Sequence, residues 1–400
     1  MKFSQQHADV AIVGGGIVGG AAALSLAKRG FSVLLLERDY YGSHSSGINF
    51  GAVRRQGRPV SQMALAARAN EIWAQLPDVI GTNGSFTRCG HLTIARNEIE
   101  LSLLEAYRDR MKGHLDLQLL RKDEVRQQYP WLGPKVIGAS LCRDDGHANP
   151  KLVSQAFARA ASAAGAIVRE RTRVDEMVHD GDQFILTSIE GRIEVRSKYL
   201  LNCAGAWANV IAMRFGEMVP MTSGHPLMAV TEPLGSVMNA SIAHETCGLY
   251  ARQAPQGHCI VGRARNFGLD EEAGKPVTER VTSMMKRAID LVPALKSIRV
   301  MRTWSGTEGY LPDNEPVIGV SSTTPGLVHG FGFAGAGFLL GPAVGAVLAE
   351  LVADGKTDTA IDAYSIGRFM RDKRDTSDLK DALHFVRPGA SLAGRSSAPR

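Results

Sequence analysis

Three glycines near the N-terminus have the spacing of a phosphate-binding turn. Gly14, Gly16 and Gly19 follow a short apolar run and open an alanine-rich stretch, and a second apolar run ends in the acidic Glu37. Residues 10–37 are therefore predicted to form a strand, a helix and a second strand. A GxGxxG motif in this context, with an acidic residue about 20 positions further on, is typical of dinucleotide-binding folds.

Each of these four residues has a distinct physical role in such a fold. Gly14 permits the tight turn after the strand, Gly16 lets a pyrophosphate approach the backbone, and Gly19 lets the helix pack closely on the strand. Glu37 is expected to accept a hydrogen bond from a ribose hydroxyl, and its charge would repel a 2′-phosphate. The motif alone does not separate NAD from FAD, so the rest of the chain has to decide between them.

Three further segments rich in small residues favour a long cofactor that touches several parts of the chain. The first is the loop 42–51, which follows the second strand. Residues 199–208 run from an apolar strand through an Ala-Gly turn into a helix, and glycines crowd residues 329–342 before a helical run. The N-terminus of that last helix could stabilise negative charge on a reduced flavin. Each segment alone is also compatible with an ordinary loop, strand end or helix contact.

The composition indicates a large globular protein and argues against several classes of function. The 400 residues are 44% hydrophobic and 22% charged, which suffices for a sizeable core. Residues 367–400 carry eight basic and four acidic side chains and so supply +4 of the net charge of +6. The rest of the chain carries nearly equal numbers of basic and acidic side chains, which gives no support for nucleic-acid binding. Glycines and the Lys28-Arg29 pair interrupt the apolar stretch 10–36, so no membrane span is predicted.

Cysteine usage favours a reducing compartment. The five cysteines are an odd number without a CxxC pair, which argues against a disulfide framework, a zinc ribbon or an iron–sulfur site in this chain. The first residues lack a secretory pattern, so a cytoplasmic location is expected. The histidines show no spacing typical of metal ligands, and no metal site is predicted.

Together, these motifs resemble those of the FAD-dependent family of D-amino-acid oxidase, glycine oxidase and sarcosine oxidase. The resemblance runs from about residue 9 to residue 369 and rests on four stretches: VAIVGGGIVGGAAALSLAKRGFSVLLLERD, DDGHANPKLVSQAFARAASAAGA, LLNCAGAWA, and LPDNEPVIGV followed by GFGFAGAGFLLGPAVG. Within the family, SGINFGAVRRQGRP and DDGHANP are most similar to the beta subunits of opine oxidase, D-hydroxyproline dehydrogenase and hydrogen cyanide synthase.

The resemblance implies an α/β fold in which two domains are interleaved. A glutathione-reductase-like Rossmann domain for FAD is expected at residues 1–86, 145–221 and 303–369. A mixed-sheet α+β substrate domain is expected at residues 87–144 and 222–302. Residues 370–400 are expected to form a charged, partly disordered extension.

The resemblance also implies which residues bind FAD. They come from the phosphate-binding turn, the loop after the second strand and the later glycine-rich segments, and comprise Gly14, Gly16, Ile17, Val18, Gly19, Glu37, Arg38, Ser45, Ser46, Asn49, Gly51, Val174, Ala204, Gly205, Trp207, Gly306, Gly332, Gly335, Gly337 and Phe338. Arg-Thr-Trp stands at residues 302–304, where monomeric sarcosine oxidase has the cysteine that tethers its flavin, so noncovalent FAD is predicted.

Arg54 is the candidate for binding a substrate carboxylate, because an arginine at this place does so in sarcosine-oxidase-like proteins. Its planar guanidinium can grip a carboxylate through two hydrogen bonds. Arg55 is its competitor, and a solvated basic turn is the alternative for the whole RRQGR segment. Tyr250 stands where related enzymes place an active-site tyrosine that could donate to a carboxylate, or it is a half-buried strand residue.

Three departures from the family pattern bear on the chemistry. The lysine associated with oxygen activation in sarcosine oxidases falls near residues 259–262, which are apolar here and therefore favour a dehydrogenase. A basic residue that holds the carboxylate in sarcosine oxidases falls at Leu339, and an arginine of glycine oxidases falls near Glu308. Glu308 would suit a substrate with a second, cationic end if it faces the pocket, or it lies on the surface.

The favoured hypothesis is an FAD-dependent dehydrogenase that oxidises the carbon–nitrogen bond of an amino acid or opine to a hydrolysable imine. It would act as the beta subunit of a hetero-oligomer, with an alpha subunit and an iron–sulfur protein to carry electrons away, since the cysteines offer no cluster site in this chain. Two alternatives stay open. One is an FAD-dependent 2-hydroxy acid dehydrogenase, and the other is a noncatalytic flavin subunit that transfers electrons.

Overall fold

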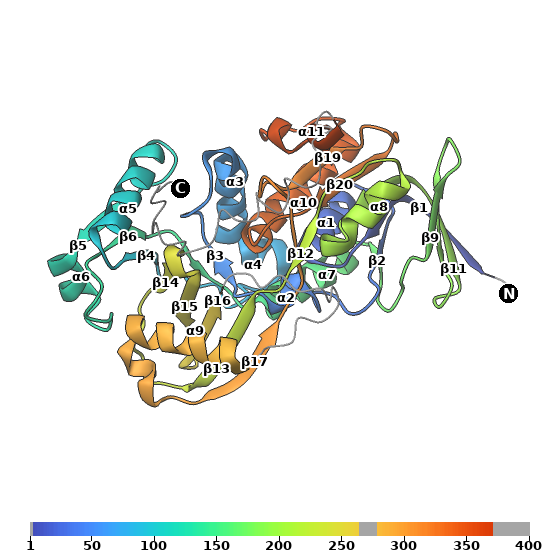
Figure 1. Ribbon diagram of the computed structural model, residues 1–400. Coiled ribbons are helices and arrows are strands. Elements are labelled where there is room, and N and C mark those ends of the chain that lie inside the picture. The colour runs from blue at the N-terminus through green and yellow to red at the C-terminus, as the bar shows by residue number, and fades with distance from the viewer. Residues whose placement is uncertain (1–2, 264–277, 371–400) are drawn as a thin grey trace, which may run out of the picture.

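A computed structural model describes residues 3–263 and 278–370, and these residues build two large sheets that lie side by side (Figure 1). Each sheet has eight strands. The chain crosses between the sheets several times, so each is assembled from segments far apart in sequence. The extension expected at residues 370–400 lies, apart from Met370, outside the described residues.

The first sheet has the parallel core predicted for a Rossmann fold. Its main path runs β19-β20-β11-β1-β2-β8, and the pairs from β20 to β8 are parallel. The strands are β1 (Ser4–Val13), β2 (Val33–Leu36), β8 (Ile167–Arg169), β9 (Glu176–His179), β10 (Phe184–Ser188), β11 (Ile193–Asn202), β19 (Val317–Val320) and β20 (Leu327–Phe331). Strands β9 and β10 are added antiparallel to β11, and β19 is antiparallel to β20. Parallel strands need helical crossovers, and these place helices against the sheet.

Three helices cover one face of this sheet and form the largest core. They are α1 (Ile17–Lys28), α7 (Pro150–Ala163) and α10 (Gly337–Ala353). Gly345 makes the contact between α10 and α1 possible, because a Cβ at this position would lie 2.5 Å from the Cβ of Ala21. This close packing fixes the N-termini of α1 and α10 relative to each other. Figure 1 shows these two helices side by side at the centre of the molecule.

The second sheet is mixed, as predicted for the substrate-binding part. Its order is β17-β13-β16-β15-β14-β4-β6-β5, and only the β14–β4 pair among these is parallel. The strands are β4 (His91–Ala95), β5 (Gln118–Arg121), β6 (Gly138–Cys142), β13 (Leu227–Pro233), β14 (Ser241–His244), β15 (Leu249–Gln253), β16 (His258–Arg263) and β17 (Val300–Ser305). Helix α9 (Thr278–Leu291) packs its buried side chains, including Met284 and Leu291, on one face.

The remaining helices and two short strand pairs complete the fold. They are α2 (Ser45–Ile48), α3 (Met63–Ala74), α4 (Leu76–Ile80), α5 (Glu98–Arg110), α6 (Lys122–Gln128), α8 (Ala208–Arg214) and α11 (Gly367–Met370), with the strand pairs β3 (Ala52–Val53)–β7 (Gly146–His147) and β12 (Thr222–Gly224)–β18 (Glu308–Tyr310). The 3₁₀ turns are Val60–Gln62, Gly205–Trp207, Glu245–Cys247, Pro293–Ser297 and Asp362–Tyr364.

The combination of a Rossmann-like parallel sheet and a mixed sheet confirms the predicted fold class. The expected domain limits stay a prediction, and the limit between residues 302 and 303 falls inside β17. Within the described part of the chain, no helix is long and apolar enough to cross a membrane.

Candidate active site

The turn between β1 and α1 leaves no room for side chains at the motif glycines. Gly14 has a φ of +112°, and a Cβ there would lie 2.2 Å from the carbonyl oxygen of Cys203. A Cβ at Gly19 would lie 2.0 Å from the carbonyl oxygen of Gly14, while one at Gly16 would meet the hydroxyl of Ser46 at 2.8 Å. The backbone N–H of Ile17 donates to the same Ser46 hydroxyl. The helix N-terminus is therefore exposed as bare backbone, which is how such turns accept a pyrophosphate.

Glu37 follows β2 beside this turn and is buried. One carboxylate oxygen accepts a hydrogen bond of 2.7 Å from the backbone N–H of Gly15, and the other accepts one of 2.9 Å from the backbone N–H of Asp39. The guanidinium of Arg38 lies 3.8 Å from the centre of the Trp207 ring, and both side chains line the same cavity. Such a stacked cation on an indole makes a flat wall for a neighbouring ring system.

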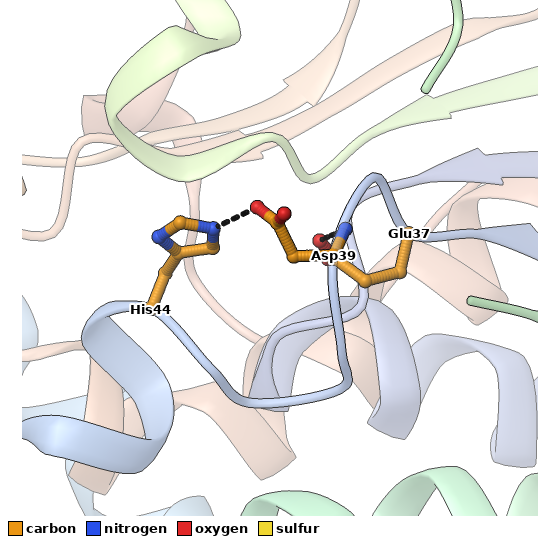
Figure 2. A group of neighbouring side chains, drawn as sticks. All are labelled: Glu37, Asp39 and His44. Atoms are coloured by element: carbon orange, nitrogen blue, oxygen red, sulfur yellow. Dashed lines mark hydrogen bonds and ion pairs between the residues drawn. The ribbon is translucent and has the colours of Figure 1, made fainter. Parts of the chain in front are cut away.

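Glu37, Asp39 and His44 also gather potential metal ligands within 4.8 Å of one another (Figure 2). Each of them already has protein partners, because Asp39 accepts from His44 Nε2 at 2.7 Å and from Arg38 Nε at 3.2 Å. These hydrogen bonds, together with those of Glu37, explain why the three side chains lie together at the edge of the nucleotide-binding turn. The sequence-based expectation of no metal stays a prediction.

One cavity of about 910 Å³ extends from this turn to the second sheet. Most of the expected FAD-binding residues line it, namely Gly14, Gly16, Ile17, Val18, Glu37, Arg38, Ser45, Ser46, Asn49, Val174, Ala204, Gly205, Trp207, Gly332, Gly335, Gly337 and Phe338. Gly19, Gly51 and Gly306 do not line it. Gly19 instead serves the packing of α1 on β1, a Cβ at Gly51 would lie 2.2 Å from the carbonyl oxygen of Ala148, and one at Gly306 would contact Ile48.

The cavity fits a large dinucleotide cofactor on structural grounds. Its volume is at the upper end of the range for small-molecule sites. Two helix N-termini open onto it, that of α1 through Gly16 and that of α10 through Gly337. Among the five described cysteines only Cys203 lines the cavity, and burial raises the pKa of its thiol to about 12.

The adjacent arginines Arg54 and Arg55 have different surroundings. Arg54 lines the cavity and makes an ion pair of 3.1 Å with Glu245. Arg55 does not line the cavity; its guanidinium lies 3.0 Å from Asp144 and 3.7 Å from Asp145. Arg55 therefore holds the loop, while Arg54 presents its guanidinium to the cavity.

Tyr250 lines the cavity from β15, and its ring lies directly over Gly262 of β16. A Cβ at Gly262 would lie 1.8 Å from a ring carbon of Tyr250, so the ring can take this position only above a glycine. The ring also contacts Phe50 edge-on at 4.7 Å between centroids. Burial and the charge of Glu308 raise the pKa of Tyr250 far above its usual value, so its hydroxyl stays protonated and can donate.

Glu308 faces the cavity and does not lie on the outer surface. It lines the cavity from β18 and accepts a hydrogen bond of 2.5 Å from the hydroxyl of Tyr310. Leu339, at the position that is basic in sarcosine oxidases, is buried in α10.

Sequence reasoning missed several residues at this end of the cavity, among them Arg58 and His91. Arg58 reaches it because Gly57 turns the chain with a φ of +80°, and burial together with the charge of Arg54 lowers its pKa to about 10. The sequence did hold one signal for Arg58, because the glycine before it in the RRQGR segment indicates a turn of the chain. His91 begins β4 without any distinctive pattern around it.

His91 is 1% exposed, and neither of its ring nitrogens has a partner among the described residues. Burial, with Arg54 and Arg58 nearby, holds its pKa well below the usual range. The imidazole is therefore neutral and keeps one donor and one acceptor for a ligand.

The model of the DAO family, described as FAD dependent oxidoreductase, matches residues 9–351. One subunit of the opine oxidase of Rhizobium meliloti is 28% identical over 90% of this chain and 97% of its own length. The 4-methylaminobutanoate oxidase (formaldehyde-forming) of Paenarthrobacter nicotinovorans is 27% identical over 94% of this chain. The chain spans about half the length of that relative, 47%.

Solved structures share the fold of this chain. The L-proline dehydrogenase from P. horikoshii superposes with a TM-score of 0.86 at 27% identity, over 92% of this chain and 99% of that one. Glycine oxidase from Geobacillus kaustophilus has a TM-score of 0.85 at 24% identity, over 90% and 99%, which shows the shared fold. Since the family model covers well over half of the sequence, the chain belongs to the DAO family of FAD-dependent oxidoreductases.

Proposed function

We propose that this chain oxidises the carbon–nitrogen bond of an amino acid or opine, with Arg54 holding a substrate carboxylate. The observation that carries the proposal is the separation of the two arginines. Among the described residues, Arg54 faces the cavity with the exposed Glu245 as its ion-pair partner, whereas Asp144 and Asp145 engage Arg55 outside it. A guanidinium in a cavity is suited to bidentate recognition of a carboxylate.

The neighbouring side chains suit a substrate that carries both an amine and carboxylates. Tyr250 can donate a second hydrogen bond to the carboxylate that Arg54 binds. Arg58 adds another cation in the same cavity, and its hydrogen bonds to two carbonyl oxygens, at 3.3 and 3.4 Å, are long. Two arginines favour a substrate with two carboxylates, as an opine has, and Glu308 supplies a negative group for a cationic end.

Bound FAD would accept a hydride from the carbon that bears the amine. The protein residues hold that carbon in place and keep the site enclosed, and the resulting imine is then hydrolysed by water. Residues 259–262 lie in β16, where Cys259 and Val261 are buried and Gly262 lies under Tyr250. Since the sequence has no lysine there, these residues support a dehydrogenase that passes electrons to another carrier.

The FAD-binding residues named from the sequence are proposed to hold the cofactor without a covalent bond. In support, the one described cysteine that lines the cavity is a buried thiol of raised pKa and therefore a poor nucleophile. A role as beta subunit, with an alpha subunit and an iron–sulfur protein as partners, is supported by the full-length match to a relative named as a subunit. Partner binding is part of this proposal.

The test is an anaerobic absorbance titration of the purified flavoprotein with amino acids, N-methyl amino acids, opines and 2-hydroxy acids. We expect an amine substrate to bleach the flavin band, and Arg54→Lys to lower the second-order rate constant of bleaching by about 10- to 100-fold, the value of one charge-assisted hydrogen bond of about 1.5–3 kcal/mol. Arg55→Lys is the matched control because it can keep its ion pair outside the cavity. Equal losses in both variants, or reduction by hydroxy acids alone, would refute the proposal.

A further inference from the structure

Three side chains form a continuous chain of hydrogen bonds beside the cavity. The Sγ atom of Cys247 lies 2.7 Å from Nδ1 of His244, and Nε2 of His244 lies 3.0 Å from a carboxylate oxygen of Glu100. Cys247 ends the 3₁₀ turn Glu245–Cys247, His244 ends β14, and Glu100 belongs to the first turn of α5. Three separate elements therefore converge on one thiol.

The carboxylate at the far end of this chain is held rigidly. Oε1 of Glu100 accepts from the hydroxyl of Thr246 at 2.7 Å, and Oε2 accepts from the backbone N–H of Arg96 at 2.7 Å. His244 is buried with 2% of its side chain exposed, while Cys247 is half-buried. The imidazole is thus fixed in position, and the thiol is within reach of small reagents.

The arrangement is a proton relay and not a metal site. Cys247 and Glu100 contact opposite nitrogens of the same imidazole ring, so one ion cannot be bound by all three side chains. A thiol, an imidazole and a carboxylate in this order have the geometry that activates nucleophilic cysteines. The carboxylate orients the ring and stabilises its protonated form.

The charges around the thiol favour its ionised form. Burial raises the pKa of Cys247, but the hydrogen bond and charge of His244, with Arg287 of α9, outweigh it, so the net pKa is lowered. Burial lowers the pKa of His244, but its bonds to Cys247 and Glu100 outweigh burial, so the net pKa is raised. Arg263 of β16 also interacts with Cys247. The opposite shifts are those of a thiolate–imidazolium pair.

A second cysteine–histidine pair in the same part of the molecule lacks these features. The Sγ atom of Cys89 lies 3.4 Å from Nδ1 of His147. The Nε2 atom of His147 has no partner among the described residues, and burial lowers the pKa of this histidine to about 3. His147 is therefore neutral, and no described carboxylate orients its ring. The Cys247 pair differs from it in its shorter sulfur–nitrogen distance and in the carboxylate of Glu100.

We propose that Cys247 is a modification site, a thiolate nucleophile held by His244 and Glu100 that reacts with peroxides and other small electrophiles. With hydrogen peroxide, the sulfur attacks one oxygen, the S–O bond forms and the O–O bond breaks. The leaving hydroxide takes the proton of the His244 imidazolium. The products are a sulfenic acid, water and neutral His244, with sulfur oxidised by two electrons and peroxide reduced by two.

The test compares the alkylation rates of individual cysteines in the full-length flavoprotein. Iodoacetamide is added between about pH 6 and 8.5, a range that spans the titration of an activated thiol, and each cysteine is quantified by peptide mass spectrometry. At about pH 6.5 we expect Cys247 to react at least about tenfold faster than Cys89, as activated cysteines next to a protonated histidine do. His244→Gln should reduce the Cys247 rate by a similar factor and leave the Cys89 rate within about twofold. A Cys247 rate no higher than that of Cys89, or one that His244→Gln does not change, would overturn the proposal.

Two further measurements test the proposal independently of the His244→Gln variant. Glu100→Gln tests the relay without removing the imidazole, and we expect it to shift the rate profile of Cys247 to higher pH. If either variant loses its flavin, the wild-type comparison of Cys247 with Cys89 still decides. Treatment with hydrogen peroxide followed by dimedone should label Cys247 and not Cys89, and absence of label at Cys247 would contradict the peroxide reaction.

Discussion

Glu245 forms an ion pair with Arg54, whose guanidinium we propose binds the substrate carboxylate. Its carboxylate lies 3.1 Å from Nη1 of Arg54, with side-chain exposures of 60% for Glu245 and 19% for Arg54. A substrate carboxylate would have to displace this group before it can bind. Glu245→Gln, which removes the charge and keeps the shape, should therefore strengthen substrate binding.

The exposure of Glu245 sets the size of the effect. An ion pair with one largely solvated partner is worth about 0.2–1 kcal/mol, because water screens the charges and side-chain entropy is lost. Removing this competitor should lower KM for a carboxylate substrate by about 1.4- to 5-fold. Salt screens the ion pair between Arg54 and Glu245 as well as the substrate carboxylate, so the ratio of the wild-type KM to the variant KM should shrink toward one as ionic strength rises.

Steady-state kinetics with an artificial electron acceptor measures this difference, with an inert carboxylate such as acetate as a second probe of the same site. The inhibition constant of acetate should fall by the same factor as KM, since both anions compete with Glu245. Thr246→Ser is a control on the same turn that keeps the hydroxyl bonded to Glu100 and leaves the ion pair in place. A KM that rises in Glu245→Gln would mean that Glu245 contacts the substrate, and an unchanged KM with unchanged acetate inhibition would refute the competition.

Three other perturbations test separate parts of the structure. Gly16→Ala places a methyl group 2.8 Å from the Ser46 hydroxyl and should weaken FAD binding by about tenfold or more, measured by flavin fluorescence, whereas Gly235→Ala has nothing within 4 Å and should not. Tyr250→Phe should raise KM by about tenfold or more, and the wild-type pH–rate profile should show no Tyr250 ionisation below about pH 10, because its pKa is raised. Glu217 accepts a hydrogen bond of 2.8 Å from His329 where both side chains are 0% exposed, so Glu217→Ala should cost about 1.5–3 kcal/mol of unfolding free energy at about pH 7. Burial raises the pKa of Glu217, but bonds from His329 and Ser322 lower it below 4.5 overall, so the stability that Glu217 provides is present above pH 4.5 and is lost as pH falls below it. The difference in urea midpoint between wild type and variant should therefore shrink in acid.

The family, the FAD cofactor and the fold class were predictable because their signals are local. The turn is marked by the positive φ of Gly14 and by Gly19, where a Cβ would lie 2.0 Å from the carbonyl oxygen of Gly14, and periodicity marks the strands around it. The mixed sheet was harder to predict because its neighbours are far apart in sequence. Strand β4 pairs in parallel with β14, where His91 lies opposite Ser241, and nothing in either strand specifies that register.

The same limit explains why the sequence did not separate Arg54 from Arg55 and why it missed His91. Arg54 and Arg55 differ only in their partners, and those partners come from residue 245 in one case and from residues 144 and 145 in the other. In the sequence, nothing distinguishes His91 from other polar residues at strand ends. Its place at the site depends on Arg54, Arg58 and the cavity, which only the fold brings around it. Chemistry that depends on one residue and its immediate backbone can be read from sequence, whereas chemistry that depends on convergence needs the fold.

The 3₁₀ turn Glu245–Cys247 links the two proposed sites. One end of the turn supplies the carboxylate that pairs with Arg54, and the other end supplies the thiol that pairs with His244. The turn is only 3 residues long, and Gly248 ends it in the left-handed region. Oxidation of the Cys247 thiolate removes its negative charge and so weakens its contact of 2.7 Å with His244, which releases this end of the turn. If both proposals hold, modification of Cys247 changes the position of Glu245 and hence substrate affinity at Arg54. A peroxide-treated enzyme should then show altered KM, and Cys247→Ser should abolish that response.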